Sequence, residues 1–122
     1  MKFEFNSSAP IYRQVAEQIE DAIASGGFSE GGQIPSTTEI SKEFHINPAT
    51  VLKGMNIVAS KKLIEKRRGL GMFVKQGARQ RILAEKRSGF FDEFVENLVR
   101  EAQNLDISED ELLNLVKRGY QR

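Results

Sequence analysis

Residues 34–61 read IPSTTEISKEFHINPATVLKGMNIVASK and contain two signals for the start of a helix. Ser36 and Glu39 have the spacing of a capping box, in which the serine hydroxyl accepts a hydrogen bond from the backbone of Glu39 and the carboxylate reaches back. Asn47 followed by Pro48 is typical of an N-cap and the first residue of a second helix. Two short helices joined by about three residues have the spacing of a helix-turn-helix, which an ordinary helical hairpin shares.

The predicted second helix runs to about Lys61 and has two unlike faces at roughly 100° per residue. One face is apolar and carries Val51, Met55 and Val58. The opposite face is small and polar with one cation, as a helix in the major groove requires for close approach and for hydrogen bonds to base edges. This polar face comprises Ala49, Thr50, Lys53, Asn56 and Ser60.

Three residues of this segment are candidate DNA contacts. Thr50 and Lys53 carry the groups best suited to hydrogen-bond base edges. Asn47 is a candidate as well, although its role as a helix cap is the simpler interpretation. Ile57 borders the polar face, and it either packs on a neighbouring element or meets a thymine methyl group.

Residues 63–74, LIEKRRGLGMFV, predict a β-hairpin with a glycine-rich turn. The cations beside its tip are Lys66, Arg67 and Arg68. Cations at such a tip can grip phosphates or enter a minor groove, and a plain hairpin with solubilising charges is the alternative. Gly69 and Gly71 tolerate positive φ and let the backbone approach a ligand closely. Two helices followed by a basic hairpin have the layout of a winged helix-turn-helix.

The charge distribution supports a phosphate-binding surface. The chain of 122 residues has a net charge of only +1, but residues 61–87 carry ten Lys or Arg against two Glu. A basic block of this kind is typical of contact with nucleic acid, and a solvated charge run is the alternative. Residues 88–122 carry four Lys or Arg against eight Asp or Glu, so we expect the tail to have another role.

Several function classes are excluded by what the sequence lacks. Cysteine is absent and His45 is the one histidine, which excludes disulfides, thiolate zinc sites and sites with several histidine ligands. The sequence has no catalytic constellation and no GxxxxGK(S/T) loop, so we expect neither an enzyme nor a cofactor. We also expect a cytoplasmic protein, because no apolar run approaches the roughly 18 residues of a membrane span and the N-terminus has no signal-peptide core.

The N-terminal residues predict an extended arm followed by a helix. Phe3 and Phe5 alternate with polar residues, as in a short strand or arm. Pro10 suits the first turn of a helix, and an apolar stripe at helical spacing follows it. Tyr12 and Gln14, near the start of this helix, either pack against the protein or contact a phosphate.

The remainder of the chain, from about Gln80, is predicted to be helical, with an interruption at Gly89 and a second capping box at Ser108 and Glu111. Two short amphipathic helices cannot enclose a core, so their apolar faces predict an interface, most simply of a two-fold homodimer. The candidate dimerisation residues are Phe91, Phe94, Val95, Leu98, Leu112, Leu115 and Val116.

Together these elements predict a fold that is mainly α with a small β-hairpin. Residues 1–77 form a winged helix-turn-helix DNA-binding domain in this interpretation, and residues 78–122 form a short two-helix dimerisation tail. The clustered phenylalanines of the tail are also compatible with a ligand pocket.

Four strings of residues resemble the GntR family of bacterial transcription regulators. They are PIYRQ at 10–14, IPS at 34–36, INPATV at 46–51 and RGLGMFV at 68–74. Their order and spacing cover residues 10–74. The short tail resembles that of the YtrA subfamily, whose C-terminal part is a small dimerisation element.

The resemblance implies a homodimer that binds a palindromic operator in double-stranded DNA, usually as a repressor and often of a membrane-transporter operon. By position, it places DNA contacts at Ser36, Thr37, Thr38, Thr50, Lys53, Arg68, Gly69 and Gly71. The alternatives are a winged-helix protein-interaction module and a repressor that senses a small ligand at the dimer interface.

Three positions depart from the family pattern. Thr38 stands where the family usually has Arg, which removes a guanidinium contact to phosphate or base. Gly54 and Met55 stand where the family has Ala-Tyr, and glycine weakens a helix by up to about 1 kcal/mol relative to alanine. Lys62 stands where the family usually has Gly and adds positive charge there.

Overall fold

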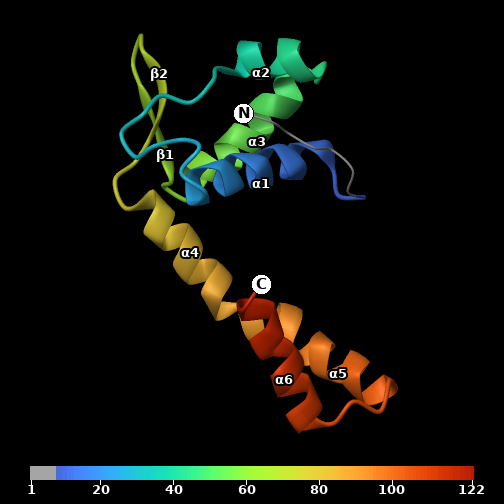
Figure 1. Ribbon diagram of the computed structural model, residues 1–122. Coiled ribbons are helices and arrows are strands. Elements are labelled where there is room, and N and C mark those ends of the chain that lie inside the picture. The colour runs from blue at the N-terminus through green and yellow to red at the C-terminus, as the bar shows by residue number, and fades with distance from the viewer. Residues whose placement is uncertain (1–7) are drawn as a thin grey trace. The chain divides into compact units, whose positions relative to one another are not determined.

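The structure, a computed structural model, describes residues 8–122 and follows the element order predicted from the sequence (Figure 1). The arm expected at Phe3 and Phe5 lies outside the described residues. The chain divides into two units, an N-terminal unit that ends at Ala84 and a C-terminal unit, Glu85–Arg122. The elements are α1 Ile11–Ala24, α2 Thr37–Phe44, α3 Pro48–Ser60, β1 Ile64–Arg67, β2 Gly71–Val74, α4 Ala78–Ser88, the π-helical turn η1 Phe91–Val95, α5 Glu96–Asn104 and α6 Glu109–Tyr120.

Both predicted caps of the helix-turn-helix are formed. Ser36 Oγ accepts from the backbone N–H of Glu39 at 3.1 Å, and the Glu39 carboxylate accepts from the backbone N–H of Ser36 at 3.1 Å. At the start of α3, Asn47 Oδ1 accepts from the N–H of Ala49 at 2.8 Å. Between the helices, His45 adopts a left-handed φ of 55° and ends α2. Each helix therefore begins where its local hydrogen bonds satisfy the first backbone donors.

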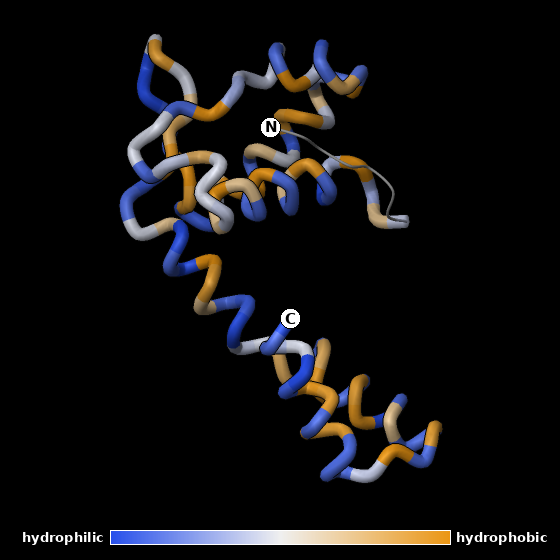
Figure 2. The backbone as a smooth tube through the Cα atoms, in the orientation of Figure 1, coloured by the Kyte–Doolittle hydropathy of each residue, from blue (hydrophilic) through white to orange (hydrophobic). Residues whose placement is uncertain are grey.

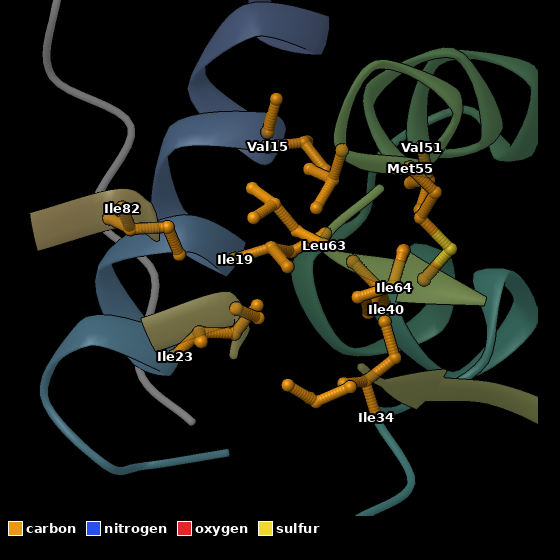
Figure 3. Packing of buried hydrophobic residues seen from close by; sticks show 14 residues of the cluster. Val15, Ile19, Ile23, Ile34, Ile40, Val51, Met55, Leu63, Ile64 and Ile82 are labelled. Carbon is orange, nitrogen blue, oxygen red and sulfur yellow. The ribbon is translucent and has the colours of Figure 1, made fainter. Parts of the chain in front are cut away.

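The apolar face of α3 packs on α1 in the core of the N-terminal unit (Figure 3). Val15 and Ile19 of α1 and Val51 and Val58 of α3 are each 0% exposed. Ile82 of α4 joins this core from the far side of α1, as Figure 3 shows. The predicted apolar face of α3 is therefore confirmed, and its burial leaves the opposite face at the surface.

β1 and β2 form the predicted hairpin, which we call the wing. The strands are antiparallel, with Ile64 opposite Val74 and Arg67 opposite Gly71. The N–H of Leu70 donates to Arg67 O at 2.9 Å and closes the turn. The basic residues Arg67 and Arg68 consequently lie at the tip, as the sequence predicts.

A short segment before α2 holds the wing against the rest of the N-terminal unit. The N–H of Gly31 donates to Val74 O at 2.8 Å, and the N–H of Val74 donates to Gly32 O at 2.9 Å. The N–H of Ile34 donates to Met72 O at 3.0 Å. Residues 31–34 thus pair with β2 on the edge that β1 leaves open.

The C-terminal unit begins within the interrupted helix that the sequence predicts. α4 ends at Ser88, Gly89 adopts a turn conformation, and η1 follows. α6 begins after Ser108, whose hydroxyl accepts from the N–H of Glu111 at 3.2 Å. The Glu111 carboxylate accepts from this hydroxyl at 3.2 Å and not from the backbone of Ser108, so the second capping box forms only in its serine half.

The C-terminal unit has almost no interior. Ala102 is the one buried side chain of Glu85–Arg122, and Figure 2 shows hydrophobic positions recurring along α5 and α6. Phe94, Leu98 and Leu105 are 54%, 44% and 69% exposed. None of the helices within residues 8–122 is long and apolar enough to cross a membrane.

Candidate nucleic-acid interface

The surface face of α3 is the centre of the candidate interface. Its exposed polar-face residues are Ala49, Lys53, Asn56 and Ser60. Thr50 is half-buried at the edge of this face, and the Ser60 hydroxyl donates to Ile57 O at 2.6 Å. Ile57 is itself half-buried against the core, so of its two predicted roles the structure shows packing on a neighbour. The small side chains leave the α3 backbone accessible to a groove, as direct base readout requires.

The start of α2 contributes a second set of predicted contacts. Ser36 and Thr38 are exposed, and Asn47 is exposed while its oxygen caps α3. The Thr37 hydroxyl instead donates to Met55 Sδ at 3.4 Å, so this hydroxyl points toward α3. Thr37 therefore presents its backbone, and not its hydroxyl, to a ligand at this helix N-terminus.

Tyr12, at the beginning of α1, lies next to Lys53 on the polar face of α3. The Lys53 ammonium stands 4.0 Å from the centre of the Tyr12 ring, a cation–π distance. A hydrogen bond from Arg13, together with the charges of Arg13 and Lys53, holds the pKa of Tyr12 below its usual value, because these cations favour the phenolate. Gln14 is 3% exposed and donates to Ala9 O at 2.7 Å, so it packs within the protein.

Gly54 brings α1 and α3 unusually close together beside this contact. A Cβ atom at Gly54 would lie 2.7 Å from Tyr12 O and 2.8 Å from Val15 Cβ. Both distances are too short for any side chain without a shift of the α1 backbone. The departure from the family's alanine therefore has a structural reason, which is the close approach of the two helices.

The three cations of the wing differ in their surroundings. Arg67 lies over the ring of Phe73, with its guanidinium carbon 4.2 Å from the ring centre, and its Nη2 is 3.5 Å from Glu65 Oε1. Lys66 and Arg68 are exposed. Arg67 is therefore held along the hairpin, whereas Arg68 is exposed at the turn.

The two glycines of the wing also differ. Gly71 has a φ of 119°, and a Cβ there would lie 2.6 Å from Gln33 Nε2, which donates to Leu70 O at 2.6 Å. Gly69 has a φ of 78°, and no described atom lies within 4 Å of its Cβ position. The predicted close approach of a ligand fits Gly69, while the φ of Gly71 favours glycine whether or not a ligand binds.

Part of the basic block stabilises the fold. Arg79 Nε donates to Ala24 O at 2.9 Å at the end of α1. Arg81 Nη2 donates to Lys62 O at 2.6 Å just beyond α3. These cations satisfy carbonyls where a helix carries partial negative charge. These two arginines of the basic block therefore have structural roles, and the cations of the wing remain candidates for phosphate contact.

The structure brings the predicted contacts of α2, α3 and the wing into one unit. Figure 1 shows the wing tip, α2 and the N-terminal end of α3 toward the same side of the N-terminal unit. A helix of this width fits a major groove, and cations beside it can contact the flanking backbone. Within residues 8–122 no cluster of three or more acidic or histidine side chains could hold a metal ion.

Two residues of this surface were not predicted. Leu52 is 49% exposed and lies on the surface of α3 beside Ala49 and Asn56. A helical wheel places Leu52 on this exposed face, but its apolar side chain does not mark it as a DNA contact. Gln33 orders the wing through Leu70, and no local pattern indicates that contact.

A family model described as bacterial regulatory proteins, gntR family, matches residues 11–74, which span the helix pair and the whole wing. The chain belongs to the gntR family. The HTH-type transcriptional regulator YhcF of Bacillus subtilis (strain 168) is 29% identical over 117 residues, which cover 96% of this chain and 95% of YhcF. The HTH-type transcriptional repressor YtrA of the same organism is 27% identical over 111 residues, 91% of this chain and 85% of YtrA.

A solved structure shows the same fold as this gntR-family chain. A GntR family transcriptional regulator from Listeria monocytogenes matches 93% of this chain and 98% of its own, with a TM-score of 0.70 and 24% identity. The expected fold is thus confirmed, a mainly helical winged helix-turn-helix followed by C-terminal helices.

The matches define the class of this gntR-family protein. It is a DNA-binding transcriptional regulator and not an enzyme. Likeness to YhcF and YtrA over most of the chain confirms the resemblance to the YtrA subfamily.

Proposed function

We propose that this gntR-family regulator is a homodimeric repressor that binds a palindromic operator, with one N-terminal unit on each half-site. The observation that carries the proposal is the exposed face of α3, which is small and polar with Lys53 as its cation. Such a face suits a major groove better than open solvent, where a helix surface is usually rich in Glu and Lys. YtrA, which matches most of the chain, is named a repressor.

In this proposal α3 enters the major groove and reads the sequence. Thr50 and Lys53 contact base edges, because a lysine ammonium donates well to guanine O6 and N7. Ser36 and the neighbouring backbone of Thr37 bind a phosphate at the N-terminus of α2, where N–H groups and the helix dipole favour an anion. Thr38 adds a hydroxyl to this phosphate contact.

The wing contacts the DNA beside the recognition helix. Arg68, exposed at the turn, enters the minor groove or binds its phosphates. Lys66 contacts the backbone, and Arg67 does so from its stacked position on Phe73. The backbone of Gly69 approaches the DNA closely, which its open surroundings favour.

The C-terminal unit supplies the dimer contact. Its exposed apolar side chains flank a groove of about 600 Å³ between α5 and α6, lined by Phe94, Leu98 and Leu112 among others. A second copy that covered this face would remove its apolar surface from water, which stabilises a dimer by about 25 cal/mol for each Å² buried. A two-fold arrangement would use the same face on both chains. The interface residues are Phe91, Phe94, Val95, Leu98, Leu112, Leu115 and Val116.

Fluorescence anisotropy tests the DNA-binding part of the proposal. The purified protein is titrated onto the palindrome-containing DNA upstream of its own operon and onto a scrambled duplex, at two salt concentrations. We expect at least about a thousandfold preference for the palindrome and a steep loss of affinity with salt. Weak and equal binding to both duplexes would contradict a specific operator-binding role.

Two variants test the assigned residues. K53A and R68A should each weaken operator binding by roughly 1–3 kcal/mol while the unfolding midpoint stays unchanged. K117A removes the same charge from α6, outside both proposed surfaces, and should leave the operator affinity unaltered. Full-strength binding by both K53A and R68A would overturn the assignment.

Two further measurements test the finer claims. Sedimentation equilibrium should give twice the chain mass of 13.8 kDa at micromolar concentration. A clean monomer would favour the alternatives, a partner-binding module or a small ligand in the groove. In vitro transcription from a template with the operator should fall when protein is added, and an operon for a membrane transporter is the target we expect.

A further inference from the structure

We infer that Tyr12 is a positioning residue for DNA recognition, which holds Lys53 of α3 with its ring and stands beside Arg13 of α1. The inference rests on the proposed function, in which Lys53 contacts DNA. It extends the DNA-binding surface from α3 onto the first turn of α1 and adds Arg13 as a contact to a backbone phosphate.

The first observation is the geometry of the lysine. Its ammonium lies 4.0 Å from the centre of the Tyr12 ring, although Lys53 is exposed and its four-carbon stem could adopt many rotamers. Fixing this side chain before binding reduces the conformational entropy lost when it docks on a base edge. The ring face leaves the ammonium N–H groups on its far side available to a hydrogen-bond acceptor.

The second observation is the spacing of the two helices. Gly54 follows Lys53 directly, and the carbonyl of Tyr12 would lie 2.7 Å from a Cβ at Gly54. The absence of a side chain at Gly54 thus sets how closely Tyr12 approaches the α3 backbone. The lysine can reach across the ring because its own helix lies against the residue that carries the ring.

The third observation concerns Arg13. Its guanidinium carbon stands 6.0 Å from the centre of the Tyr12 ring. Tyr12 therefore has two cations near its ring, Lys53 of α3 and Arg13 of its own helix. A phosphate oxygen of the DNA backbone is the ligand that Arg13 and the phenol of Tyr12 would bind, since guanidinium groups recognise phosphate.

The test separates the ring of Tyr12 from its hydroxyl. Y12F keeps the ring and removes the hydroxyl, whereas Y12L removes both. Operator affinity is measured by anisotropy for these two variants, in the wild-type background and in the K53A background. We expect Y12L to bind about threefold more weakly than Y12F in the wild-type background and equally in the K53A background.

A structural role for Tyr12 would give a different pattern. Destabilisation would weaken Y12L in both backgrounds and lower its unfolding midpoint, so the midpoint of each variant is measured in parallel. Equal binding of Y12F and Y12L in the wild-type background would overturn the inference. K53A itself binding at full strength would instead overturn the proposed function, and the inference with it.

Arg13 has its own measurement. R13A should weaken binding to the operator and to scrambled DNA by similar factors, and it should reduce the slope of log affinity against log salt by about 1. Y12F should also reduce this slope, because the phosphate contact proposed for Arg13 loses the neighbouring phenol hydroxyl. An unchanged slope for R13A would exclude the phosphate contact.

Discussion

The N-terminal unit buries its apolar side chains, whereas the C-terminal unit leaves most of them exposed. Ile19 and Val51 are 0% exposed in the first unit, but Phe91 and Leu105 are 60% and 69% exposed in the second. Both units are built from amphipathic helices, so composition does not explain the difference. In the N-terminal unit α1, α2, α3, the start of α4 and the wing surround one core, whereas α5 and α6 are too few and too short to enclose one. The N-terminal unit thus buries its apolar side chains within one chain, whereas the C-terminal unit leaves an apolar face that the proposed dimer would cover.

Truncation of the closed core should produce the largest effect. I19A removes three carbons from a fully buried site and should lower the free energy of unfolding of the N-terminal unit by about 3 kcal/mol. L105A is the matched truncation in the C-terminal unit and should cost less than about 0.5 kcal/mol in the monomer. Urea titration of both variants measures the difference. A cost for L105A as large as that of I19A would show that its side chain is covered in solution.

A charge in the open face should act on association and not on folding. L98D places a carboxylate between α5 and α6 and should raise the dimer dissociation constant at least about 100-fold, because a charge buried at an interface without a partner is costly. N104D adds the same charge at the end of α5, away from the groove. Sedimentation equilibrium of the two variants distinguishes them, and an unchanged dimer in L98D would contradict the proposed interface.

Substitution of Gly54 should destabilise the N-terminal unit against the trend of helix propensity. Alanine is the better helix former by up to about 1 kcal/mol, but overpacking against Tyr12 and Val15 costs about 1–3 kcal/mol. We expect G54A to lower stability by about 1 kcal/mol in thermal unfolding. G119A is the control in α6, where no described atom lies within 4 Å of the Cβ position, and it should be neutral or stabilising.

Removal of a helix cap should have a smaller, similar effect in each unit. S36A and S108A each delete a hydroxyl that accepts from a backbone N–H, and each should cost its unit about 1 kcal/mol. The Ser36 backbone N–H also donates to the Glu39 carboxylate, and S36A leaves that bond in place. The Ser108 hydroxyl, in contrast, also donates to the Glu111 carboxylate, so S108A removes two bonds. Circular dichroism melts of both variants should therefore show the larger loss for S108A, and the reverse order would show that the bond from the Ser108 hydroxyl to the Glu111 carboxylate adds nothing.

Most of the fold could be predicted because its signals are local. The caps at Ser36 and Asn47 bond within three residues, and the glycine-rich turn of the wing lies between its own strands. The polar face of α3 follows from helical period alone. These features need no knowledge of the rest of the chain.

The contacts that refine the site could not be predicted, because they join distant residues. Gln33 bonds Leu70 across 37 positions, and Arg79 bonds Ala24 across 55. The contact between Tyr12 and Lys53 likewise depends on how α1 crosses α3. Sequence patterns name such side chains as exposed cations or polar residues without showing what holds them.

The pairing of residues 31–34 with β2 affects how the regulator adapts to its DNA. Ile34 lies two positions before Ser36, the N-cap of α2, and its N–H donates to Met72 O. The wing is thus linked to the segment that leads into α2. We expect this link to fix the distance between the wing tip and Ser36 before the protein binds DNA. A site whose grooves do not match this span must bend or narrow to fit. Sequence steps that the protein never touches would then influence binding through the stiffness of the DNA.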